Sequence, residues 1–84
     1  ELDNTNPKAW LGHGNVQSKL ARWKEAISDY SAALQLDPDY SLALYNRGVA
    51  RTNAGIYKEA CEDINAAAKL GVKVDPAIRQ KACK

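Results

Sequence analysis

The sequence lacks several residue types on which function often depends. Its 84 residues include no methionine, no phenylalanine, one histidine and two cysteines. His13 stands far from Cys61 and Cys83, so these residues offer no closely spaced metal ligands, and we expect no metal and no cofactor. We expect His13 to be a packing or surface residue. Two cysteines make no dense disulfide framework of the secreted kind, and we expect two small, half-buried apolar side chains whose redox role stays open.

Long apolar runs and strong charge are also missing. No run approaches the roughly 18 apolar residues of a membrane-spanning helix, and the N-terminus does not resemble a signal peptide. A formal net charge of +2 gives no electrostatic footprint for a nucleic acid. The sequence contains no nucleophile elbow, phosphate loop or zinc motif. We therefore expect a soluble, cytoplasmic protein that spans no membrane, binds no nucleic acid and is not an enzyme.

The sequence does contain an internal repeat. Shifted by 34 positions, the segment Trp23–Pro38, WKEAISDYSAALQLDP, lies over Tyr57–Val72, YKEACEDINAAAKLGV. A period of this size is typical of stacked units that cannot bury their apolar faces alone. The opening Glu1–Asn4, ELDN, is similar to Gln35–Pro38, QLDP, in sequence and phase. We therefore expect a piece cut from a longer array, and a targeting signal could lie outside it.

Apolar residues at helical spacing predict two antiparallel helix pairs and a final helix. Asn6-Pro7 predicts a capped start, because proline at the first helical position loses no hydrogen bond. Gly55 and Gly71 predict helix C-termini, because glycine readily adopts the left-handed backbone conformation that ends a helix. The helices are expected over residues 8–19, 23–36, 41–54, 57–70 and 75–84. The expected core comprises Trp23, Ala26, Ile27, Tyr30, Ala33, Leu34, Leu44, Tyr45, Gly48, Ala60, Ile64, Ala67 and Leu70.

Two kinds of residue in these helices need a separate interpretation. Gly12 and Gly14 cost helix stability, about 1 kcal/mol each against alanine, and this indicates that at least Gly14 lets another helix come close. Gly48 stands 34 positions after Gly14, and we interpret it in the same way. Asp29 and Asp63 recur in register with lysines one turn away. We interpret both aspartates as solvated ion-pair partners on the wet side of their helices, not as a catalytic pair.

The combined pattern resembles the tetratricopeptide repeat. The residues that carry it are Trp10, Gly14, Trp23, Ala26, Tyr30, Ala33 and Pro38 in the first repeat, and Leu44, Gly48, Gly55, Tyr57, Ala60, Ile64 and Ala67 in the second. Val72 departs from it, since proline is usual there. The resemblance implies one all-α domain over residues 1–84, a short right-handed solenoid of helix hairpins. Residues 1–6 would end a preceding repeat, 7–40 and 41–74 would be full repeats, and 75–84 would cap the stack or begin a third.

The resemblance also implies a function. In this family the first helix of each pair lines a concave groove that holds a peptide of a partner protein, so the chain would be a protein-interaction scaffold. Asparagine suits such a groove because its amide offers both donors and an acceptor. The groove candidates are Lys8, Leu11, Asn15, Ser18, Leu42, Tyr45, Asn46, Val49, Asn53 and Arg79.

Two alternatives to this function stay open. Asn15 and Asn46 stand where chaperone-binding relatives carry the asparagines of a carboxylate clamp, but Leu11, Pro76 and Gln80 stand where the clamp's cations are expected. A clamp without charged donors loses most of its advantage. The chain could instead be a structural spacer or self-association piece, pairing through apolar stacking faces. Those faces would include Ile78, Leu2 and Trp10.

Overall fold

The computed structural model describes residues 5–83, which are folded into α-helices joined by short turns. In chain order these are α1 (Pro7–Lys19), α2 (Trp23–Leu36), α3 (Ser41–Asn53), α4 (Tyr57–Lys69) and α5 (Pro76–Ala82). No strand occurs in this part of the chain, so the all-α prediction is confirmed. Leu2, one of the expected stacking residues, lies outside the described residues. None of the helices in residues 5–83 is long and apolar enough to cross a membrane.

Local sequence signals set the helix ends. Asn6 Oδ1 accepts a hydrogen bond from the backbone N–H of Lys8 at 2.9 Å, and Asp75 Oδ1 accepts one from Ala77 at 2.9 Å. Each cap precedes a proline in the first turn. Gly55 and Gly71 adopt φ values of 81° and 97°, the left-handed region that glycine enters without a Cβ penalty. The predicted helix starts and glycine stops are therefore confirmed.

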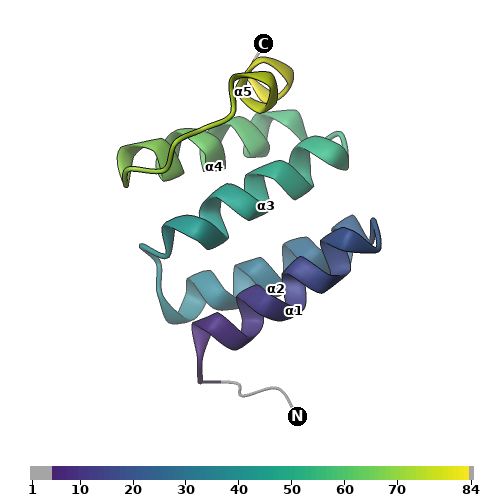
Figure 1. Ribbon diagram of the computed structural model, residues 1–84, viewed down its shortest axis with the longest axis vertical. Helices are drawn as coiled ribbons and strands as arrows, with labels where there is room; N and C mark the ends of the chain where they lie inside the picture. The colour runs from purple at the N-terminus through teal and green to yellow at the C-terminus, as the bar shows by residue number, and fades with distance from the viewer. Residues whose placement is uncertain (1–4, 84) are drawn as a thin grey trace.

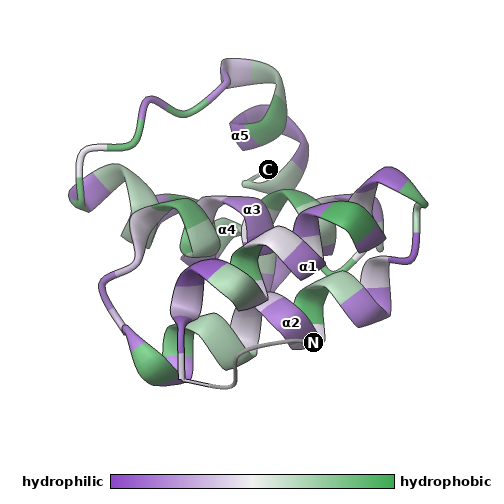
Figure 2. Cartoon of the chain, turned by 60° about the horizontal axis from the view of Figure 1, so that its bottom comes forward, coloured by the Kyte–Doolittle hydropathy of each residue, from purple (hydrophilic) through white to green (hydrophobic). Residues whose placement is uncertain are grey.

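The helices form two antiparallel pairs, with α5 closing one end. α1 packs along α2 and α3 along α4, while α2 joins the pairs by packing on α3. In Figure 1, α1, α3 and α5 lie toward the viewer, and α2 and α4 lie behind them. Hydrophobic and hydrophilic residues alternate along each helix in Figure 2, as expected of amphipathic helices that share one core. The molecule measures 39 × 26 × 17 Å along its principal axes.

Glycine lets the helices of each pair approach one another. A Cβ built on Gly14 would lie 2.6 Å from Cε1 of Tyr30, and one built on Gly48 would lie 2.7 Å from Cδ1 of Ile64. Tyr30 and Ile64 are among the largest fully buried side chains. The interpretation of both glycines as close-approach positions is confirmed. Trp10, which we named among the stacking faces, is half-buried and packs against the core of Ala33, Leu34, Ala43, Leu44 and Ala67.

Three predictions about individual residues are wrong. Leu70 is 44% exposed because α4 ends at Lys69, and Val72 packs against the core beyond it. Asp29 and Asp63 are only 8% and 4% exposed, so they are not solvated. Each stands three residues after a buried alanine, Ala26 or Ala60, and therefore shares the buried face of its helix.

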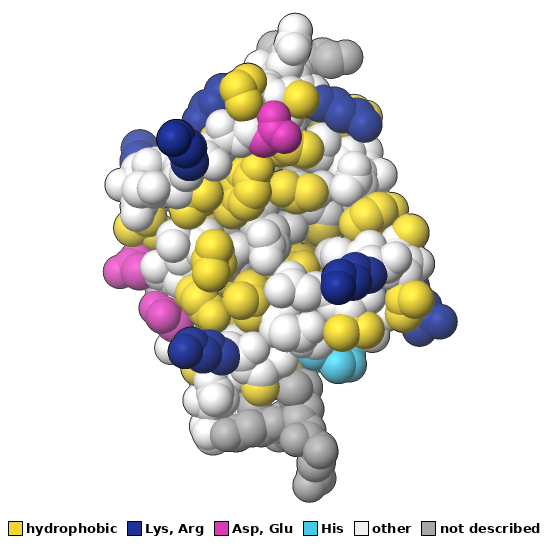
Figure 3. Space-filling view, viewed as in Figure 1, with side chains coloured by type: hydrophobic (Ala, Val, Ile, Leu, Met, Phe, Trp, Pro, Cys, Tyr) yellow, Lys and Arg dark blue, Asp and Glu magenta, His cyan; other side chains and the backbone are white. Residues whose placement is uncertain are grey.

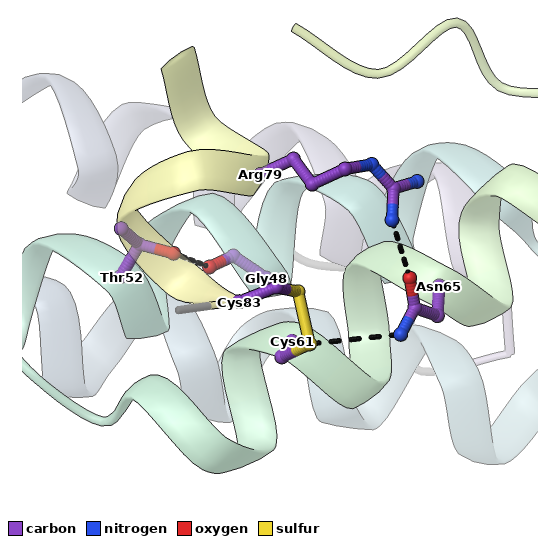
Figure 4. Close-up of a disulfide and its surroundings, with 6 residues drawn as sticks. All are labelled: Gly48, Thr52, Cys61, Asn65, Arg79 and Cys83. Carbon is purple, nitrogen blue, oxygen red and sulfur yellow. Dashed lines mark hydrogen bonds between the residues drawn. A yellow bond between two sulfur atoms is a disulfide. The ribbon is translucent and has the colours of Figure 1, made fainter. Parts of the chain in front are cut away.

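The two cysteines, expected as small half-buried side chains with an open redox role, are linked to each other. Cys61 of α4 and Cys83, which follows α5, are joined by a disulfide with a Cα–Cα distance of 5.0 Å. The two residues are 22 positions apart, and they meet because α5 packs against α4. Figure 4 shows the bond between them. Both are half-buried, as expected, but the bond makes α5 a covalently fastened part of the fold.

Candidate functional site

A hollow of about 640 Å³ lies on the face formed by α1, α3 and α5. Figure 3 shows this face, with hydrophobic side chains gathered across its middle and Lys and Arg side chains around them. We call this hollow the groove. It is lined by Asn15, Ser18, Lys19, Trp23, Tyr30, Tyr45, Asn46, Val49, Asn53, Asp75 and Ile78.

Six of the ten candidates chosen from the sequence line the groove: Asn15, Ser18, Tyr45, Asn46, Val49 and Asn53. The other four lie elsewhere. Lys8 and Leu42 are exposed but outside the lining, and Leu11 packs against the core of both helix pairs. Arg79 turns toward α4, where its Nη1 donates to Oδ1 of Asn65 at 2.6 Å. These four residues do not line this hollow, and a peptide contact at them stays a prediction.

A hydrogen-bonded network fixes the polar floor of the groove. The Tyr30 hydroxyl donates to Asn15 Oδ1 at 2.7 Å, and Asn46 Nδ2 donates to the same oxygen at 3.0 Å. Because the single phenolic proton is used there, the Ser18 hydroxyl donates to Tyr30 Oη, at 3.0 Å. The network thus runs from α2 through α1 to α3.

Burial protects the donor at the centre of this network. Burial raises the pKa of the Tyr30 phenol above its usual 10.0, the hydrogen bond from Ser18 lowers this pKa, and the nearby Asp29 carboxylate adds a smaller increase. The phenol therefore stays protonated at neutral and mildly alkaline pH. It holds the Asn15 amide in one orientation under those conditions.

Other polar groups of the groove keep unused hydrogen-bonding capacity. Asn15 accepts twice through Oδ1, so the N–H groups of its amide are left to donate. Asn46 keeps its carbonyl and one N–H, and Asn53 is exposed. Val49 and Ile78 add apolar surface, and the charged residues of the lining are Lys19 and Asp75. The groove therefore combines amide donors and acceptors with apolar surface and carries one charge of each sign.

Five lining residues were missed from the sequence. Trp23 and Tyr30 belong to α2, and the Tyr30 ring reaches the groove because it passes over Gly14. Lys19 could have been found, since it stands 34 positions before the candidate Asn53. Asp75 and Ile78 come from α5, and their position depends on where that helix docks. The Asp75 backbone N–H donates to Tyr45 Oη at 3.3 Å.

Two side-chain contacts at equivalent positions of the repeats join the helices of each pair. The His13 ring nitrogen Nδ1 lies 2.5 Å from Asp29 Oδ2, and Arg47 binds both oxygens of Asp63 at 2.8 Å. Arg51 also donates to Asp63 at 2.8 Å. The lysine partners expected for both aspartates were therefore the wrong residues. Arg47 further donates to Ser31 Oγ at 3.2 Å, so one guanidinium links α3 to both α2 and α4.

The carboxylate clamp is only partly present. Asn15 and Asn46 lie side by side as a clamp requires, but Leu11 is packed in the core, Pro76 opens α5, and Gln80 is an exposed amide. Lys19 is the cation among the lining residues. No group of three or more His, Cys, Asp or Glu side chains within residues 5–83 could hold a metal ion.

Comparison with known proteins places part of the chain in a family. A family model described as TPR repeat matches residues 22–55. The chain is 42% identical over 62 residues to the peroxisomal targeting signal receptor of Candida glabrata, an alignment that covers 70% of this chain and 10% of that protein. It is 35% identical over 63 residues to serine/threonine-protein phosphatase T of Aspergillus oryzae, an alignment that covers 75% of this chain and 13% of that protein.

A third relative is human DnaJ homolog subfamily C member 7, 36% identical over 59 residues, which cover 70% of this chain and 12% of that protein. The alignments with these three relatives cover only 10%, 13% and 12% of their lengths. The relatives are therefore similar to the chain over a short segment of their own length.

Proposed function

Because the chain belongs to the tetratricopeptide-repeat family, whose repeats mediate contacts between proteins, we propose that its groove binds an extended peptide segment of a partner protein. The observation that carries this proposal is the fixed amide pair Asn15 and Asn46, which lies in a hollow with apolar sides. A peptide backbone offers N–H and C=O groups at regular spacing, and these are the groups that asparagine amides bind.

Preorganisation supports the proposal. Asn15 is held by Tyr30, and Asn46 is held by Asn15, so neither amide has to be ordered when a peptide arrives. Ordering a free side chain at an interface costs about 0.5–1.5 kcal/mol, and the network removes that cost from binding. A volume of about 640 Å³ falls within the range of roughly 300–1,000 Å³ that is usual for ligand pockets.

The apolar residues give the groove its selectivity. Val49 and Ile78 line the groove together with the ring of Tyr45, and such residues take alternate side chains of an extended segment. One relative is named as a receptor for a targeting signal, which is in keeping with recognition of a segment of another protein.

The test uses peptides selected from a random library displayed on phage, each of about 10 residues, which span roughly 33 Å when extended. We expect Val49→Glu to weaken the selected peptides at least about tenfold, a loss of about 1.4 kcal/mol, because it places a charge among the apolar contacts. Leu42→Glu is the matched control, since it adds the same charge to α3 outside the groove and should change affinity by less than about twofold.

Binding is measured by isothermal titration calorimetry, and circular dichroism verifies that both variants keep their helices. Equal loss of affinity in the two variants would point to a nonspecific charge effect and contradict the groove assignment. Undiminished binding by the Val49→Glu protein would contradict it as well.

A further inference from the structure

The helix α5 is too short to hold itself in place. It has seven residues, and isolated helices shorter than about 12–15 residues are marginal in water. It is attached to the rest of the protein by the Cys61–Cys83 disulfide, by the Arg79–Asn65 hydrogen bond and by the buried Ala82, and it also contacts α3. Figure 4 shows the first two together, both reaching α4.

The two ends of α5 have different neighbours. Its first turn contributes Ile78 to the groove, and Asp75 just before it also lines the groove and bonds Tyr45 of α3. Its last turn leads directly to Cys83, which is bonded to Cys61 of α4. The disulfide at the C-terminal end of α5 therefore holds in place the N-terminal end of the helix, which forms one side of the groove.

The disulfide is accessible from solvent. Cys61 and Cys83 are half-buried and line a second surface hollow of about 500 Å³. Its other lining residues are Tyr57, Lys58, Glu62, Asn65, Lys81 and Ala82. Small thiols attack as thiolates, and two ammonium groups against one carboxylate give this hollow a positive balance that favours their approach.

We infer that the disulfide is a redox latch that controls the groove: reduction of Cys61–Cys83 releases α5 and lowers the affinity of the groove for its peptide. This inference rests on the proposed function. The reductant is a dithiol. One of its thiolates attacks a sulfur of the disulfide, the other cysteine leaves as a thiolate, and the second thiol of the reductant then displaces the first cysteine. The reductant closes to a cyclic disulfide, and two electrons and two protons end on Cys61 and Cys83.

Release follows because little else fastens α5. After reduction the Arg79–Asn65 hydrogen bond, the Asp75–Tyr45 hydrogen bond and the buried Ala82 remain, and both hydrogen bonds are exposed. An exposed hydrogen bond exchanges readily with water and is weak compared with a covalent bond. When α5 undocks, Ile78 and Asp75 leave the groove, while the amide pair of Asn15 and Asn46 stays on α1 and α3. Affinity then falls without loss of the fold.

The first readout needs no ligand. Amide hydrogen exchange, followed by mass spectrometry, is compared for the oxidised protein and for protein reduced with dithiothreitol. We expect reduction to speed exchange in residues 76–82 at least about tenfold and to leave α1 and α2 unchanged. The double variant Cys61→Ser/Cys83→Ser is the control, and its α5 should exchange rapidly whether or not dithiothreitol is present. Unchanged exchange in α5 after reduction would overturn the latch.

The second readout is the affinity of a library-selected peptide for the same samples. We expect reduction to weaken binding about five- to tenfold in the wild-type chain and to have no effect on the double variant. Release of α5 with unaltered affinity would overturn its control of the groove. Binding of no peptide in either state, with α5 released on reduction, would count against the proposed function and leave the latch supported as a conformational device.

Discussion

Replacing Asp63 with asparagine is expected to lower the free energy of unfolding by about 3 kcal/mol. The side chain of Asp63 is 6% exposed and accepts from Arg47 and Arg51. Removing its charge leaves two guanidinium groups inside the helix contacts without their anion, and breaking a buried pair in this way costs far more than losing a surface ion pair. Breaking a buried ion pair costs about 3–5 kcal/mol, and we expect the lower value here because both arginines keep some contact with water.

Urea unfolding followed by circular dichroism measures this loss, with the disulfide kept oxidised throughout. A drop of 3 kcal/mol corresponds to a melting temperature about 12 °C or more lower in a domain of this size. Glu62→Gln is the matched control, because Glu62 is the neighbouring exposed residue on α4, and its effect should stay within about 0.5 kcal/mol. If both variants unfolded at the same urea concentration, the ion pairs of Asp63 with Arg47 and Arg51 would not stabilise the fold as described above.

Two glycines of α1 are expected to respond to alanine with opposite signs. Gly14→Ala should lower the free energy of unfolding by about 1–2 kcal/mol, because its Cβ would lie 2.6 Å and 2.8 Å from atoms of the buried Tyr30 ring. Gly12→Ala should raise it by up to about 1 kcal/mol, since a Cβ there meets nothing within 4 Å and alanine favours the helix. The expected difference between these variants is about 2–3 kcal/mol.

The same unfolding experiment separates the two effects, and each glycine variant serves as the other's control. The helix propensity gained is the same at both positions, so the difference reports the contact with Tyr30 alone. Stabilisation by Gly14→Ala as large as that by Gly12→Ala would mean that the ring does not pass over this glycine. The Tyr30 hydroxyl could then not be held against Asn15.

The helices and the close approaches were predictable because their causes are local or repeated. Asn6-Pro7, Gly55 and Gly71 carry the helix ends in their own backbone preferences. Gly14 and Gly48 recur at the repeat interval and each faces a large residue of the following helix, Tyr30 or Ile64. Sequence periodicity reports such contacts because the same packing occurs twice.

The aspartates show where the reasoning from sequence stopped short. Local spacing suggested lysine partners one turn away, but the actual partners lie across the helix pair, 16 residues upstream in both cases. The interval of 34 that relates Asp29 to Asp63 also relates His13 to Arg47. Applying it to possible partners as well as to the aspartates would have indicated both pairs.

The α5 side of the groove could not be predicted in the same way. The disulfide has no counterpart in the preceding repeat, because Cys61 and Cys83 stand 34 positions after Ile27 and Val49. Asp75 and Ile78 enter the groove only because α5 docks across α4 and α3. The direction of Arg79 likewise depends on how α5 docks, and in the structure its side chain reaches Asn65 of α4.

Chemical-shift mapping with a library-selected peptide tests most directly whether the groove is the binding surface. In a titration of ¹⁵N-labelled oxidised protein, we expect the largest changes at Asn46, Val49 and Asn53 and at the side-chain amide of Asn15. The outer sides of α2 and α4, reported by exposed residues such as Lys24 and Lys58, should shift little. Changes concentrated at those lysines, with the α3 residues unmoved, would contradict peptide binding in the groove.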